Sequence, residues 1–269
     1  RVEEAKARFH HLFALLRARP LTQDPAWPGK RPPGMDPVAA ERILWDARWR
    51  LEKAEIPFFL SHGTLLGIVR NGHLLPHDKD MDIGLPWEVD RQRVVALFCH
   101  DGAYYHLNPV NQNGPEEIYN LSLRCRESPI FLDLFFYRPD GEHWVCGFQH
   151  RPRPITSRPR RFAIGHLTWR GAEWPVPVPT EQYLIDYYGA DWRIPNPCFD
   201  TALSSRSPTP ESRGDRWIFG YLQLSKKLLN RDWHNALGYC WQLLELQEDA
   251  PIRELLPWIR SMRGQHGQS

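Results

Sequence analysis

The sequence lacks the features that would place it among zinc-binding or membrane-spanning proteins. Its five cysteines are odd in number and widely spaced, and no two of them form a Cys-x-x-Cys pair. A structural zinc site is therefore not expected. No apolar run approaches the roughly 18 residues needed to span a bilayer, and we expect no signal peptide. A chain separated from a membrane anchor would look the same, so peripheral membrane association stays open.

Neither sign of charge is in large excess, because 34 Lys and Arg residues nearly balance 32 Asp and Glu residues in a chain of 269. Nothing in that balance favours a nucleic-acid partner. The cysteine pattern fits a reducing compartment, so we expect a cytoplasmic protein. The sequence is rich in proline (25 residues) and tryptophan (12 residues). These numbers indicate a loop-rich surface with aromatic platforms, or a core filled by large rings.

Hydrophobic periodicity predicts an α+β fold, with a β-rich middle between helical ends. We expect an N-terminal helix and connector over 1–35, a catalytic core over 36–200, and a C-terminal helical region over 201–269 packed on the core. Residues 200–214 are polar and expected to be mobile. The expected helices are 3–18, 36–56, 88–100 closed by Gly102, 181–188 capped by Thr180, 217–247 and 251–262. The expected strands are 58–60, 80–85, 118–126, 130–137, 144–148 and 162–178.

The most informative window is residues 62–86, HGTLLGIVRNGHLLPHDKDMDIGLP, in which Asp78, Asp80 and Asp82 are spaced two apart. Side chains alternate faces along a strand, so Asp80 and Asp82 point the same way, while Met81 and the apolar residues that follow it face the core. Two carboxylates on one face repel each other. A hard cation with oxygen ligands, such as Mg²⁺, would offset that repulsion.

Upstream of the aspartates, Gly63 and Thr64 open a short apolar run that ends at Arg70. A glycine followed by a hydroxyl residue at a helix start presents backbone N–H groups, which suit a phosphate. Arg70 suits a phosphate as well, because its planar guanidinium forms forked hydrogen bonds. Phosphate donors and metal ligands this close together favour phosphoryl or nucleotidyl transfer.

A further carboxylate, Asp133, is the one polar residue in the apolar segment FLDLF. An ionised group there is costly unless it is paired or bound to a metal. Arg124 and Arg126 are expected to share one face of the neighbouring strand. They would either bind phosphate or neutralise the acids, and Asp133 would accordingly be either a catalytic or a structural acid.

The segment GTLLGIVRNGHLLPHDKDMDIGL resembles the LicD/fukutin family, whose pattern runs GTLLG-x-x-R and then P-x-D-x-D-hydrophobic-D. A second block, VPVPTEQYLIDYYGADWRIP, is similar to the family as well, and the likeness covers roughly residues 55–200. Two departures stand out: His77 where a Trp is common, and Lys79 where many members have another acid. The zinc-holding cysteine cluster of one family member has no counterpart.

The resemblance implies a polymerase-β-like nucleotidyltransferase fold: a mixed sheet flanked by helices, with helical N- and C-terminal additions. It implies a phosphotransferase that moves a phospho-alcohol from a CDP-activated donor to a glycan or glycolipid acceptor in cell-surface polysaccharide synthesis, such as that of a capsule. Mg²⁺ or Mn²⁺ would be the cofactor. Asp80, Asp82 and Asp133 would be catalytic and, with Asp78, would hold metal. Donor phosphates would contact Gly63, Thr64, Arg70, Arg124 and Arg126.

Other interpretations stay open. The aspartates could form a solvated turn, although a calcium loop would need a different spacing. The same carboxylates would also serve a nucleotidyltransferase that moves NMP from NTP, and a non-catalytic glycan-binding module could keep the fold. The basic loop at 151–161 is either solvated or attractive to an anionic glycan. Tyr183, Tyr187, Tyr188 and Trp192 are expected mostly to pack, with one of them available to stack on a base.

Overall fold

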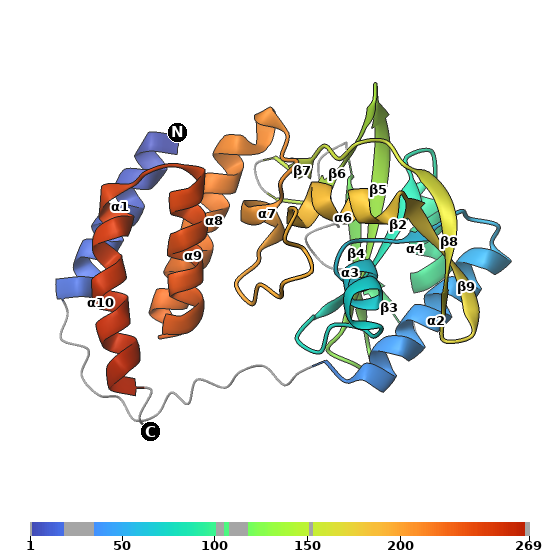
Figure 1. The fold of residues 1–269 in the computed structure, drawn as a ribbon, viewed down its shortest axis with the longest axis horizontal. Helices are drawn as coiled ribbons and strands as arrows, with labels where there is room; N and C mark the ends of the chain where they lie inside the picture. The colour runs from blue at the N-terminus through green and yellow to red at the C-terminus, as the bar shows by residue number, and fades with distance from the viewer. Residues whose placement is uncertain (1, 19–34, 101–104, 108–117, 151–152, 267–269) are drawn as a thin grey trace. The chain divides into compact units, whose positions relative to one another are not determined.

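The computed structural model describes residues 2–18, 35–100, 105–107, 118–150 and 153–266 (Figure 1). Their contacts divide the chain into two compact units. One unit combines residues 1–32, 195–205 and 210–269, and the other combines 33–194 with 206–209. The N-terminal helix therefore belongs to the same unit as the C-terminal helices. Over the described residues, no helix is long and apolar enough to cross a membrane.

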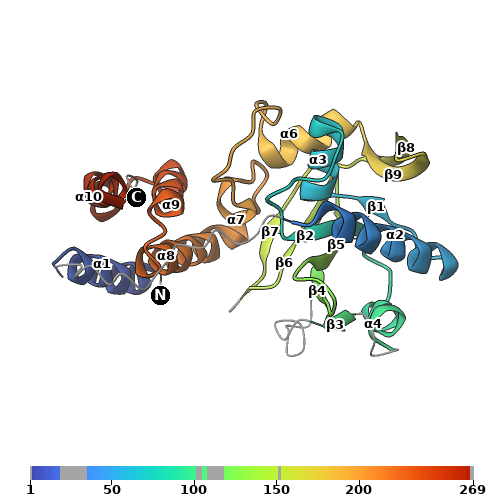
Figure 2. The same ribbon diagram turned by 90° about the horizontal axis from the view of Figure 1, so that it is seen from below.

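The first unit is built on four long helices, which lie side by side in both views (Figures 1 and 2). These are α1 (Val2–Ala18), α8 (Arg213–Leu229), α9 (Trp233–Leu246) and α10 (Ala250–His266), accompanied by the short elements α7 (Thr201–Ser204) and η1 (Pro210–Ser212). Their apolar faces enclose one core, with Phe13, Leu224 and Ile252 almost fully buried. Asp249 receives hydrogen bonds from Tyr221 and the backbone N–H of Ile252, so the start of α10 is tied to α8.

The second unit is built on a mixed sheet in the order β1-β2-β5-β4-β3, with β6 and β7 extending from β5. Parallel pairing joins β2 to β5, while the other pairings of this sheet are antiparallel. The strands are β1 (Phe59–Leu60), β2 (Asp80–Pro86), β3 (Tyr105–Leu107), β4 (Asn120–Cys125), β5 (Phe131–Asp140), β6 (His143–Phe148) and β7 (Ile155–Ser157). The expected antiparallel meander is thus present from β4 to β6, whereas β7 is a buried strand within the segment 151–161 that the sequence predicts to be an exposed basic loop.

Helices and a separate hairpin complete this unit. The helices are α2 (Pro37–Lys53), α3 (His62–Asn71), α4 (Arg91–Cys99) and α6 (Thr180–Tyr188), and β8 (Ala163–Trp169) pairs with β9 (Ala172–Val178). Asp36 caps α2 as expected, since its side chain accepts a hydrogen bond from the N–H of Val38 at 3.0 Å. The mixed sheet flanked by helices confirms the α+β class predicted from the sequence.

Several element boundaries differ from the expectation. The helix expected at 217–247 is two helices, because the backbone turns between Leu229 and Trp233, with Arg231 at a φ of 55°. The polar segment 200–214 contains α7, which Asp200 caps by accepting from the N–H of Ala202. Thr180 is the first residue of α6 rather than its cap, and its hydroxyl donates to the carbonyl of Pro177. Gly102 and most of the 20–35 connector lie outside the described residues.

Candidate metal and phosphate site

Strand β2 carries two of the expected metal ligands on one face. Asp80 and Asp82 alternate with Met81 and Ile83, which are at most 1% exposed and belong to the main core. The alternation predicted from the sequence is therefore realised. Asp78 precedes the strand, and its ligand atom lies within 4.8 Å of those of Asp80 and Asp82. Three carboxylates consequently converge at the start of β2.

Strand β5 adds the fourth carboxylate beside them. Asp133 is paired in register with Asp82 across the parallel ladder, and with Ser122 on β4. Residues opposite each other in a sheet share a face, so Asp133 lies next to Asp82. The hydroxyl of Ser122 bonds to Asp133. The Oδ1 atom of Asp133 is buried and has no hydrogen-bond partner among the described residues. We call Asp78, Asp80, Asp82 and Asp133 the carboxylate cluster.

Helix α3 packs against β2 and fixes both the backbone and the side chain of Asp82 by hydrogen bonds. The N–H of Gly63 donates to Oδ2 of Asp82 at 2.8 Å, and the N–H of Asp82 donates to the Thr64 hydroxyl at 2.7 Å. Thr64 is 1% exposed. The sequence predicts that Gly63 and Thr64 face a donor phosphate. In the structure both groups are instead engaged with Asp82, so their observed role is to orient this carboxylate.

Two glycines of α3 stand where an added Cβ would meet close neighbours. A Cβ on Gly63 would lie 2.4 Å from Oδ2 of Asp78 and 3.1 Å from Oδ2 of Asp82. A Cβ on Gly67 would lie 2.9 Å from the carbonyl of His73. The two glycines of the GTLLG motif therefore let α3 approach the carboxylates and the loop that leads to Asp78.

The electrostatics of the carboxylate cluster are those of like charges held out of water. Burial, followed by the charge of Asp80, raises the pKa of Asp133 to about 7. Burial, followed by the charges of neighbouring aspartates, raises the pKa values of Asp78 and Asp82 well above their usual range. Asp78 and Asp80 are close enough to share a hydrogen bond. Such a group binds either protons or a cation.

The three expected phosphate-binding arginines occupy different places. Arg124 is exposed on β4 opposite Phe131, which pairs in turn with Asp80, so it shares the face of the carboxylate cluster. Arg126 does not share that face through strand alternation, because β4 ends at Cys125. Arg70 is half-buried, with Nε donating to Asn71 at 2.8 Å and Nη1 to the carbonyl of Trp192 at 3.3 Å.

Residues of the second sequence block, 176–195, contact α3 and the carboxylate cluster. The sequence predicts only a packing role for most of them. Tyr183 on α6 accepts a hydrogen bond from the N–H of His62, the first residue of α3, at 3.1 Å. Trp192 binds Arg70, the last but one residue of the same helix. Tyr188 is close to Asp82, and burial followed by that charge raises its pKa well above the usual range. The block therefore holds α3 at both ends.

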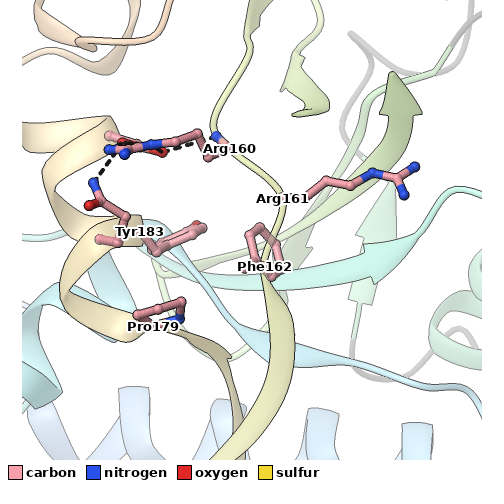
Figure 3. A pocket seen from close by; sticks show the side chains of 7 residues that line it. Arg160, Arg161, Phe162, Pro179 and Tyr183 are labelled. Atoms are coloured by element: carbon pink, nitrogen blue, oxygen red, sulfur yellow. Dashed lines mark hydrogen bonds and ion pairs between the residues drawn. The ribbon is translucent and has the colours of Figure 1, made fainter. Parts of the chain in front are cut away.

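A small pocket lies beside α6 (Figure 3). Phe162 and Pro179 form its apolar walls together with Tyr183, and the rim carries Arg160 bound to Asp186 at 2.6 Å. No member of the carboxylate cluster lines this pocket. The ion pair with Asp186 also neutralises part of the basic loop that the sequence predicts at 151–161.

Comparison with known proteins identifies the domain. Residues 55–179 match the family described as LicD/FKTN/FKRP, nucleotidyltransferase domain. Residues 55–179 belong to the LicD family. The segment contains the whole carboxylate cluster and all of α3. The family resemblance predicted from the sequence is thus confirmed.

Two relatives that this chain is similar to are the ribitol-5-phosphate transferases FKTN of Homo sapiens and of Macaca fascicularis. Each is 27% identical over 179 residues, which is 64% of this chain and 37% of the relative. The chain therefore spans little more than a third of the length of these relatives. Among solved structures, the lincosamide adenylyltransferase LnuA with bound lincomycin aligns at a TM-score of 0.39 and 14% identity, over 54% of this chain and 84% of that one.

Proposed function

We propose that this chain is a metal-dependent transferase of the LicD family that moves a phospho-alcohol from a CDP-activated donor to a hydroxyl of a glycan or glycolipid. The observation that carries the proposal is the carboxylate cluster, in which Asp78, Asp80 and Asp82 converge within the family's domain and Asp133 lies in register beside Asp82. The names of the relatives, ribitol-5-phosphate transferases, support ribitol phosphate among the candidate groups. Phosphocholine and glycerol phosphate are the other candidates.

The residues present fit a divalent cation. Among the described residues, the buried Oδ1 of Asp133 has no hydrogen-bond donor. Burial, followed by the charges of neighbouring aspartates, raises the pKa values of Asp78 and Asp82. Oxygen ligands of this kind suit Mg²⁺ or Mn²⁺. Asp80, Asp82 and Asp133 would hold the ion, with Asp78 as a further ligand. When bound, the ion supplies positive charge to the donor phosphates.

The protein groups have separate tasks in the transfer. The acceptor oxygen forms a bond to phosphorus, the bond from phosphorus to the CMP oxygen breaks, and the hydroxyl proton leaves for a base. Asp133 would be either a ligand of the ion or that base, and it lies beside Asp82 for either role. Arg124 and Arg70 would bind donor phosphate, the former from the exposed face and the latter from the end of α3. We place the reaction on the cytoplasmic side of cell-surface polysaccharide synthesis.

The test combines binding with product analysis. Melting temperature is measured with Mn²⁺ and CDP for the wild type, Asp82→Asn and the matched control Asp90→Asn. Asp90 is an exposed cap of α4, and Asn is an equally good cap. We expect Mn²⁺ and CDP to stabilise the wild type and Asp90→Asn, and to lose their effect in Asp82→Asn. Equal stabilisation of all three proteins would refute the metal site.

Product analysis then separates the candidate reactions. Incubation with CDP-ribitol, CDP-glycerol or CDP-choline and a glycan acceptor should release CMP. Release of pyrophosphate from an NTP would instead favour the nucleotidyltransferase alternative, which the family's domain description supports. Stabilisation by a glycan with no turnover of any nucleotide would favour a glycan-binding module.

A further inference from the structure

The backbone at the start of α3 has an unusual conformation next to the carboxylate cluster. His62 has a φ of 39°, in the left-handed region that disfavours a residue with a side chain, and it is 6% exposed. Its N–H points to Tyr183, whereas the N–H of the following residue, Gly63, points to Asp82. The left-handed turn is thus what separates the directions of two successive N–H groups.

The surroundings hold this turn in place. The His62 ring packs against Phe135 at 4.4 Å and Tyr187 at 4.6 Å between ring centres. Burial lowers the pKa of His62 to about 3, so the ring is neutral and packs as an aromatic group. Ring packing fixes the side chain, but the backbone direction needs a partner for the N–H. That partner is the hydroxyl of Tyr183.

Tyr183 is itself held on several sides. Its hydroxyl is 2.8 Å from the hydroxyl of Tyr137 on β5, the strand that carries Asp133. Its ring meets Phe162 edge-on, at 5.4 Å between ring centres, across the pocket of Figure 3. A hydroxyl placed this firmly can act as a reference point for the turn, which a mobile side chain could not do.

We propose that Tyr183 is a positioning residue for the metal site: its hydroxyl holds the His62 turn so that the Gly63 N–H fixes Oδ2 of Asp82. The role rests on the proposed function, because the oriented carboxylate matters only if it binds a cation. Groups behind metal ligands often change metal affinity strongly when they are removed. Tyr183 would act through Gly63 and Asp82, without touching the metal or substrate.

Tyr187→Phe is a matched control for Tyr183→Phe. Both tyrosines lie on α6, both are almost fully buried, and each change removes one buried hydroxyl. The Tyr187 hydroxyl contacts Cys146 at 3.4 Å and Tyr137 at 3.5 Å, but not the backbone of α3 in the bonds of the described residues. A general loss of packing would therefore affect both variants alike.

The experiment measures the affinity for Mn²⁺ alone by calorimetry, and the melting temperature without metal, on the full chain. We expect similar losses of melting temperature in the two variants. Tyr183→Phe should bind Mn²⁺ about 10-fold more weakly than the wild type, and Tyr187→Phe should bind it as the wild type does. Equal Mn²⁺ affinities in the two variants would overturn the role of Tyr183 and leave the proposed function intact.

Two further outcomes complete the test. If Tyr183→Phe does not fold, Tyr137→Phe takes its place, because it removes the support of the Tyr183 hydroxyl and leaves that hydroxyl present. It should weaken Mn²⁺ binding relative to Tyr187→Phe, and an affinity equal to that control would overturn the inference. If the wild type does not bind Mn²⁺, both the proposed metal site and the role of Tyr183 are overturned.

Discussion

Replacing Gly63 by alanine should damage the carboxylate cluster while leaving the fold stable. The new Cβ would lie 2.4 Å from Oδ2 of Asp78, where ordinary contact begins at 3.4 Å, so the carboxylate has to move by about 1 Å. The same Cβ would lie 3.1 Å from Oδ2 of Asp82. The end of a short side chain can move, so the change is cheap for the fold. It is costly for a site that tolerates displacements of only about 0.5 Å.

The expected effect on metal affinity follows from that displacement. Misplaced ligands and their supports typically cost 10- to 100-fold in affinity, and we expect about 10-fold for Mn²⁺ measured by calorimetry. Stability should stay level or rise, because alanine favours a helix over glycine by up to about 1 kcal/mol. Gly63 lies in the first turn of α3 and has no positive φ that would penalise a side chain.

Gly72→Ala is the matched control in the same helix. Gly72 follows the end of α3 with a φ of 75°, and a Cβ there would meet nothing within 4 Å. It should lose about 1 kcal/mol of stability through backbone strain and bind Mn²⁺ normally. Gly63→Ala should therefore lose Mn²⁺ affinity and keep its stability, whereas Gly72→Ala should lose stability and keep its Mn²⁺ affinity. The reasoning is refuted if Gly63→Ala binds Mn²⁺ as the wild type does, or if Gly72→Ala weakens binding equally.

Three other changes test separate parts of the site. Burial, followed by the charge of Asp80, raises the pKa of Asp133 to about 7, whereas an aspartate in an unfolded chain has a pKa of about 4. The stability that protonated Asp133 contributes is therefore full below about pH 4 and is lost as the pH rises through about 7. Asp133→Asn should flatten this loss of stability with pH, measured as the melting temperature without metal. Arg70→Lys should weaken CDP binding about 10-fold in calorimetry with Mg²⁺, because the forked guanidinium is lost. Gly67→Ala should lower the melting temperature by forcing the backbone at His73, 2.9 Å away, to move.

The sequence predicts the strand part of the site well because strands alternate regularly. Asp80 and Asp82 had to share a face once Met81 and its apolar neighbours were assigned to the core. Asp133 could be placed with them because it is the one polar residue in an apolar segment. What the sequence could not supply is the pairing itself: the parallel register of Asp82 with Asp133 depends on which strands are neighbours.

The parts that were missed depend on tertiary contacts. Gly63 and Thr64 match a phosphate-binding helix start by residue type, yet their hydrogen bonds go to Asp82, a partner 18 to 19 residues away. Arg126 fits an alternating strand until the turn after Cys125 ends that strand. Tyr183 has the composition of a packing residue, and only the fold brings its hydroxyl to the N–H of His62.

Within the carboxylate cluster, burial and the charges of neighbouring aspartates disfavour the ionised acids. Raised pKa values mean that the metal-free protein is more stable when these acids carry protons. Protons and a divalent cation then compete for the same oxygens, so metal affinity must fall as pH drops through 7. A cation at 100 times its dissociation constant would add about 2.7 kcal/mol of stability. The hydrogen bonds from Gly63 and Ser122 orient Asp82 and Asp133, and we expect these contacts to matter more for binding of the proposed cation than for folding.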